Sequence, residues 1–86
     1  MTRPIISEQT DLQVDACGLQ CPLPLLKTRQ ALRHMRPGQM LVVQATDAGS
    51  ARDIPAYVGQ SSHQLVRREQ ADGCYTFLIR CGEQES

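Results

Sequence analysis

Two prolines separated by one residue, Pro22 and Pro24, restrict where a helix can begin in this 86-residue chain. Proline is tolerated in the first turn of a helix, because the N–H groups there lack helical partners, and it breaks a helix one turn later. The pair therefore predicts a helix that starts at Pro22, with Pro24 as its third residue. Cys21 is then expected at the N-cap, which fixes the direction of its thiol.

The spacing of apolar residues changes several times along the chain, before and after the helix start expected at Pro22. Leu12, Val14 and Ala16 alternate with polar residues, as in a half-buried strand, whereas the segment after Cys21 has helical spacing. The Pro37-Gly38 pair ends that helix, and Ala71-Asp72-Gly73 indicates a hairpin turn. The expected strands are 12–16, 40–46, 64–70 and 74–80, and the expected helices are 22–36 and about 51–59.

This order, βαβαββ, predicts an α/β chain of the α+β two-layer sandwich type. A right-handed crossover is expected to join the first two strands in parallel, and the last two form an antiparallel hairpin. The fold is then a four-stranded mixed sheet with two helices on one face. We expect one domain over residues 1–86, with an ordered core of about 11–81 and flexible tails at 1–10 and 82–86.

Composition excludes several classes of protein. Nine basic residues balance nine acidic ones, and the aromatic residues are two tyrosines and one phenylalanine, so stable nucleic-acid binding is not expected. No apolar run approaches a membrane span and residues 1–10 lack a secretory signal, so we expect a cytoplasmic protein without membrane contact. The cysteine spacings, Cys17 to Cys21 and Cys74 to Cys81, do not match a structural zinc site, and neither metal nor cofactor is expected.

Cys21 differs from the other thiols because a helix N-terminus favours the thiolate. Pro22 and Pro24 lack N–H donors, which leaves Leu23 N–H as the main first-turn amide for the sulfur. We therefore expect a modest lowering of the Cys21 pKa, which suits a thiol that must both attack and leave.

The first helix is also expected to carry four cations, Lys27, Arg29, Arg33 and Arg36, and no acid. One interpretation is a docking surface for an acidic patch on a partner protein. The other is a solvated face whose later cations complement the helix C-terminus.

The chain resembles the TusA-like (SirA-like) family of sulfur-transfer proteins. The resemblance rests on residues 12–24 (LQVDACGLQCPLP), Pro37-Gly38, Thr46-Asp47, 52–55 (RDIP), 63–66 (HQLV) and 75–80. It implies a cysteine, here Cys21, that accepts sulfane sulfur as a persulfide, with Gly18, Pro22 and Pro24 shaping its turn. The implied partners are a cysteine desulfurase or rhodanese-like donor and a downstream relay acceptor. The implied pathways are tRNA thiolation, molybdenum-cofactor assembly or dissimilatory sulfur metabolism.

Several alternatives stay open at this point. Cys17 is either a second thiol that forms a disulfide with Cys21 or a buried packing residue. His63 is either a general base or, by our preference, a structural histidine. Cys74 is expected to pack and Cys81 to be exposed. The chain as a whole could instead be a non-catalytic regulatory or RNA-contacting module, or a Cys17/Cys21 redox switch.

Overall fold

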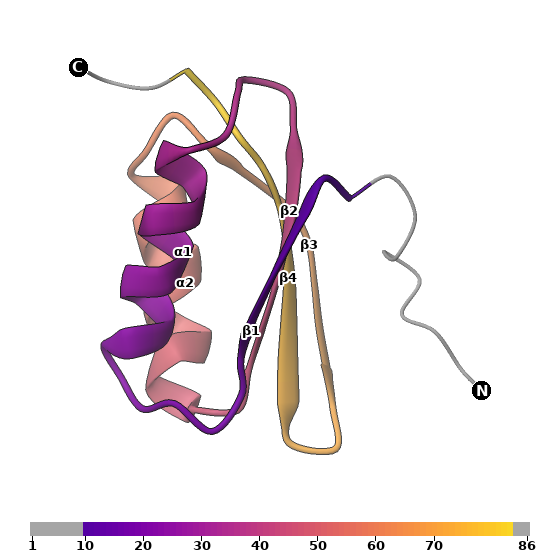
Figure 1. Cartoon of the computed structure of the whole chain (residues 1–86). Helices are drawn as coiled ribbons and strands as arrows, with labels where there is room; N and C mark the ends of the chain where they lie inside the picture. The colour runs from indigo at the N-terminus through magenta and orange to yellow at the C-terminus, as the bar shows by residue number, and fades with distance from the viewer. Residues whose placement is uncertain (1–9, 84–86) are drawn as a thin grey trace.

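The computed structural model describes residues 10–83 as a helical layer packed on one face of a sheet (Figure 1). The four strands are β1 (Leu12–Ala16), β2 (Met40–Ala45), β3 (Gln64–Ala71) and β4 (Cys74–Arg80). The two helices are α1 (Leu23–Arg33) and α2 (Ala48–Gly59). This confirms the expected βαβαββ order and the two-layer sandwich.

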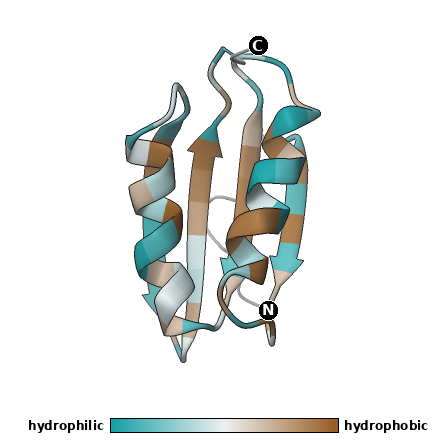
Figure 2. Cartoon of the chain, turned by 90° about the vertical axis from the view of Figure 1, so that its left-hand side faces the viewer, coloured by the Kyte–Doolittle hydropathy of each residue, from teal (hydrophilic) through white to brown (hydrophobic). Residues whose placement is uncertain are grey.

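The sheet order is β1-β2-β4-β3, with β1 and β2 parallel and the other two pairings antiparallel. The parallel register pairs Val14 with Val43, and the antiparallel register then pairs Val43 with Phe77. Both crossovers lie on the same face, so α1 and α2 run side by side and begin at the same end of the molecule (Figures 1 and 2). That common end carries the site described below.

The core lies between the helices and the sheet. Alternate residues of β2 and β4 point toward the helical layer, since successive strand residues face opposite sides. The strands seen between the helices are largely hydrophobic (Figure 2). The buried cluster consists of Leu32, Met35, Leu41, Val43, Ile54, Val58, Phe77, Ile79 and Cys81. Burial of Cys81 contradicts our expectation of an exposed thiol, because β4 carries it under the end of α1, where its Sγ contacts the Leu32 carbonyl oxygen at 3.7 Å.

The helix boundaries differ from those expected. Pro22, not Cys21, is the N-cap of α1, and the Cys21–Pro22 peptide bond is cis. The first helical residues are therefore Leu23 and Pro24, and Cys21 precedes the cap. At the other end α1 stops at Arg33, so Arg36 lies beyond it.

The second helix begins earlier than expected, at Ala48. Asp47 caps it by accepting hydrogen bonds from Ser50 N–H at 3.0 Å and from Ser50 Oγ at 3.3 Å. A side-chain oxygen at the N-cap that accepts a first-turn N–H is the usual way in which a helix start is stabilised. Pro55 lies inside the helix, not in its first turn.

Residues 1–9 and 84–86, most of the predicted tails, lie outside the described residues. Gly82 and Glu83 are described, and both are tied to the residues that precede β3. Gly82 N–H donates to His63 Nδ1 at 2.9 Å, and Ser62 Oγ donates to the Glu83 carbonyl oxygen.

Candidate functional site

The parallel pairing of β1 and β2 brings two loops together at one edge of the sheet. The segment that follows β1 leads to Cys21, and the segment that follows β2 leads to Asp47 and α2. Parallel strands place their carboxyl ends at the same edge, where α/β proteins commonly form sites. A direct link joins the two loops, because Gly18 N–H donates to Thr46 Oγ1 at 2.9 Å.

Cys21 is exposed, and its thiol meets a carboxylate from the second helix. Its Sγ donates a hydrogen bond to Asp53 Oδ2 at 3.0 Å. Asp53 is half-buried in the second turn of α2. The thiol proton therefore has a defined acceptor within the protein.

The hydrogen bond to Asp53 raises the pKa of the Cys21 thiol above its ordinary value. Partial desolvation and the negative charges of Asp53 and Asp47 act in the same direction, and only Arg52 opposes them. Our prediction of a lowered pKa is therefore wrong. The amide that we expected to stabilise the thiolate, Leu23 N–H, donates to the Gln20 carbonyl oxygen at 2.8 Å.

Gly49 forms one wall of the site. A Cβ at this position would lie 3.0 Å from Asp47 Oδ2, 3.4 Å from Cys21 Cβ and 3.8 Å from Cys21 Sγ. The absence of a side chain lets the first turn of α2 approach the cysteine closely. Gly49 therefore determines how much room exists beside the sulfur.

The residues predicted to shape the turn have distinct positions. Gly18 has a φ of +83°, a left-handed conformation that favours glycine. Pro24 is buried, and its carbonyl oxygen accepts a hydrogen bond from the buried Thr28 hydroxyl at 2.8 Å. Pro22 is exposed beside Cys21. The start of α1 is thus anchored from inside while the cysteine faces solvent.

Cys17 interacts with Cys74 and Asp15 and not with Cys21. Partial desolvation, followed by contacts with the Asp15 carboxylate and the Cys74 thiol, raises the pKa of Cys17 to about 11. Asp15 Oδ1 also accepts the Cys17 N–H at 3.1 Å. All four cysteines are free thiols.

The four predicted docking cations do not share one surface. Lys27 lines a groove between α1 and β1, together with Leu12, Val14 and His34. Arg29 and Arg33 line a different cavity, on the side of α1 next to α2. Arg36 follows the helix. Lys27 therefore lies on a different side of α1 from Arg29 and Arg33.

His63 has a structural contact through Nδ1, which accepts the Gly82 N–H. It lies just before β3, opposite the end of β4, whereas Cys21 lies at the start of the helices. Burial lowers the pKa of His63. The geometry supports the structural interpretation over a base for Cys21.

Within residues 10–83, no three metal-binding side chains come together in a way that could hold an ion. Over the same residues, neither helix is long and apolar enough to cross a bilayer.

Asp53 and Gly49 are the site residues that the sequence analysis did not assign. The second helix was expected to begin at about residue 51, which would place Asp53 in its first turn. The available signal was the Asp47-Ala48-Gly49-Ser50 cap, which places the helix start earlier and moves Asp53 to its second turn.

The fold and site together define a small two-layer α/β domain in which an exposed cysteine, Cys21, directly precedes a proline-initiated helix. The same fold is found in a crystal structure of the SirA-like protein from Desulfitobacterium hafniense, with a TM-score of 0.72 and 23% identity. That match covers 84% of this chain and 99% of the other.

Sequence comparison identifies the family. The family model described as Sulfurtransferase TusA matches residues 12–81. The chain is 41% identical over 70 residues to the sulfur carrier protein TusA of Allochromatium vinosum, covering 81% of this chain and 92% of that protein. The chain therefore belongs to the TusA family of sulfurtransferases, as the sequence motifs indicated.

Proposed function

We propose that this protein carries sulfane sulfur as a persulfide on Cys21 and relays it from a donor protein to an acceptor protein. The observation that supports this most directly is the Cys21 thiol itself, which is exposed yet has a proton acceptor at 3.0 Å. The Allochromatium relative, described as a sulfur carrier, supports the same role.

The loading step is a displacement at sulfur. The Cys21 sulfur attacks the outer sulfur of a donor persulfide, a new S–S bond forms, and the donor's own S–S bond breaks. The electron pair of the broken bond leaves on the donor cysteine as a thiolate. The Cys21 proton passes to the Asp53 carboxylate and from there to that thiolate or to solvent.

The release step reverses the roles. An acceptor thiolate attacks the outer sulfur, and Cys21 becomes the leaving group. A thiol with a raised pKa leaves poorly as a bare thiolate, so the proton that the acceptor thiol gives up, passed on through Asp53, assists its departure. Asp53 therefore serves both steps and keeps the unloaded cysteine protonated between partners.

Docking is proposed on the apolar rim beside Cys21. Leu23 and Leu26 lie three residues apart at the start of α1 and are 47% and 42% exposed, so together they form a small apolar patch close to Cys21 in the sequence. Lys27 follows them on the same side of the helix. A donor or acceptor protein with an apolar patch and a nearby acidic residue would fit this rim. A docking role for Arg29, Arg33 and Arg36 stays a prediction.

The test is sulfur loading by intact mass. Incubation with a cysteine desulfurase and cysteine is expected to add the mass of one sulfur, and reduction should remove it. Cys21→Ser is expected to abolish the gain, whereas Cys81→Ser, which changes a buried thiol, serves as the matched control. A gain that persists in Cys21→Ser contradicts the proposal.

A further inference from the structure

A polar cavity lies at the end of the molecule away from Cys21. Its volume is about 290 Å³, and its lining includes Arg29, Arg33, Tyr57, Gln60, His63 and Glu83. The helices begin beside Cys21 and end at this cavity, and α1 rises about 16 Å over its 11 residues. The cavity is therefore separate from the proposed persulfide site.

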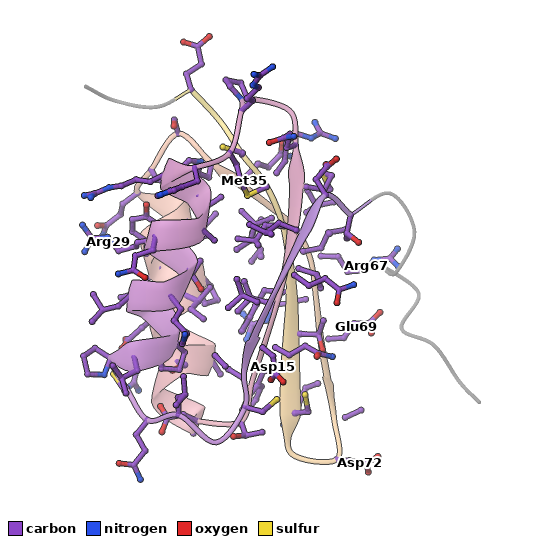
Figure 3. All side chains as sticks on the ribbon, viewed as in Figure 1. Asp15, Arg29, Met35, Arg67, Glu69 and Asp72 are labelled. Carbon is purple, nitrogen blue, oxygen red and sulfur yellow. The ribbon has the colours of Figure 1, made fainter. Side chains whose placement is uncertain are left out.

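The cationic side of the cavity is held in place by an aromatic residue. The Arg29 guanidinium lies 5.5 Å from the centre of the Tyr57 ring, a distance at which the cation and the ring attract each other. Arg33 follows one helical turn later and lines the same space. Figure 3 shows Arg29 directed away from the sheet, on the opposite side of the molecule from Arg67.

The imidazole on the other side is also fixed. His63 Nδ1 accepts the Gly82 N–H at 2.9 Å, so the proton of the neutral ring is on Nε2. Burial lowers the pKa of His63, which is consistent with a neutral ring. The Tyr57 and His63 rings lie 6.2 Å apart. His63 therefore has one nitrogen left for a ligand, and it is a donor.

These donors have no acceptor within the described part of the chain. The side chains of Arg29, Arg33 and Tyr57 make no hydrogen bond or ion pair with residues 10–83. The lining includes a single carboxylate, that of Glu83, and the Ser61 hydroxyl is already engaged with the Val58 carbonyl oxygen. Convergent donors without acceptors are the arrangement that binds an oxyanion.

We propose that this cavity binds a small oxyanion of the sulfate or phosphate class. Arg29 and Arg33 supply the positive charge, and Tyr57 and His63 Nε2–H supply neutral donors. The carbonyl ends of both helices and the Glu83 carboxylate oppose an anion at the opening, so the binding expected from the two guanidinium groups is weak and limited to a small ion. The cavity is large enough for such an ion with several waters.

The test is a titration with inorganic phosphate and with sulfate, followed by backbone-amide NMR at constant ionic strength against chloride. Saturable shifts are expected for residues 29–33, 57–63 and Gly82, with little change at Cys21. Arg29→Gln and Arg33→Gln are each expected to weaken the apparent affinity about tenfold, the usual scale for a charged hydrogen bond. Arg67→Gln on β3 is the charge-matched control and should bind as the unmodified protein does.

Shifts that do not saturate, or that spread equally over Arg67 and Arg80, would overturn the proposal, because they indicate general screening. Equal weakening by Arg67→Gln would overturn it too. A dispersed spectrum in each variant shows that the fold is retained. No sulfur donor is present in this experiment, so its outcome is independent of the persulfide proposal.

Discussion

The Cys21 thiol donates a hydrogen bond to the Asp53 carboxylate over 3.0 Å, although the two residues are 32 positions apart in the sequence. The bond links the loop after β1 to the second turn of α2. It also sets the protonation of the cysteine, because a carboxylate that accepts the thiol proton favours the thiol over the thiolate. The proposed persulfide role therefore requires the Cys21 proton to be removed before or during attack.

Replacing Asp53 with asparagine is expected to make Cys21 more reactive toward simple alkylating agents at neutral pH. The substitution preserves the shape of the side chain and puts a neutral amide in place of the carboxylate, whose hydrogen bond with the thiol and whose charge both raise the Cys21 pKa. The pH profile of iodoacetamide alkylation should therefore move to lower pH, with a severalfold higher rate near pH 7. Mass spectrometry of the Cys21 peptide measures the rate.

Asp72→Asn is the matched control, since Asp72 lies in the exposed β3–β4 turn (Figure 3). The rate at which a donor protein loads sulfur onto Cys21 should instead fall, because Asp53→Asn removes the proposed proton carrier. An alkylation profile identical to that of the unmodified protein would contradict the effect assigned to the Asp53 carboxylate on the Cys21 pKa.

Substitution of Gly49 by alanine is expected to slow sulfur loading with little change in stability. The new Cβ would lie 3.8 Å from Cys21 Sγ and crowd the space for an outer sulfur. Alanine gains about 1 kcal/mol of helix propensity, which offsets a loss of similar size at the Asp47 cap. Loading rate and thermal midpoint are the two measurements.

Gly59→Ala provides the control for that substitution, because a Cβ at Gly59 meets no atom within 4 Å. Both variants exchange a helical glycine of α2 for alanine. Equal loading rates in the two variants would show that Gly49 does not limit access to the sulfur.

Oxidation by hydrogen peroxide is expected to join Cys17 to Cys74 and not to Cys21. The Cys17 thiol interacts with that of Cys74. Peroxide takes two electrons and two protons from the thiols and is reduced to water, so the protein loses the mass of two hydrogens. Peptide mapping identifies the pair.

Cys74→Ser should prevent this loss of mass, whereas Cys81→Ser should not, since Cys81 is buried elsewhere in the core. Recovery of a Cys17–Cys21 disulfide would instead restore the redox-switch interpretation.

The raised pKa of Cys17 predicts a loss of stability at alkaline pH. Its value of about 11 in the folded protein exceeds the ordinary 9.0. The unfolded chain therefore releases the proton first, and the free energy of unfolding falls as pH rises from about 9 to 11. Below pH 9 both states hold the proton and no change is expected from this group.

Urea midpoints at pH 8, 9 and 10 measure this effect. The measurement uses the Cys21→Ser variant as the parent protein, because the raised pKa of Cys21 also lowers stability at alkaline pH. Adding Cys17→Ser to that background should flatten the decline. An equally steep decline in the double variant would assign the effect to other groups.

Much of the fold follows from local sequence pattern. Alternation at 12–16 predicted β1, and the strand expected at 40–46 corresponds to β2, which lies in the interior of the sheet. The Ala71-Asp72-Gly73 turn gave the hairpin, where Asp72 and Gly73 both have positive φ. The start of α1 was displaced by one residue, because prolines are compatible with several first-turn positions.

The sequence by itself determined the family and singled out Cys21 as the candidate reactive residue, since Cys21 and its prolines are neighbours in the chain and need no folding to be recognised. Tertiary structure alone decided the chemistry of that thiol. The parallel pairing of β1 with β2 brings α2 against Cys21, so Asp53 and Gly49 become its neighbours from about 30 residues away. A pKa depends on the charges and hydrogen-bonding groups around the titrating atom, and tertiary packing sets these. For this reason the pKa of Cys21 is raised, although the sequence predicted that it would be lowered.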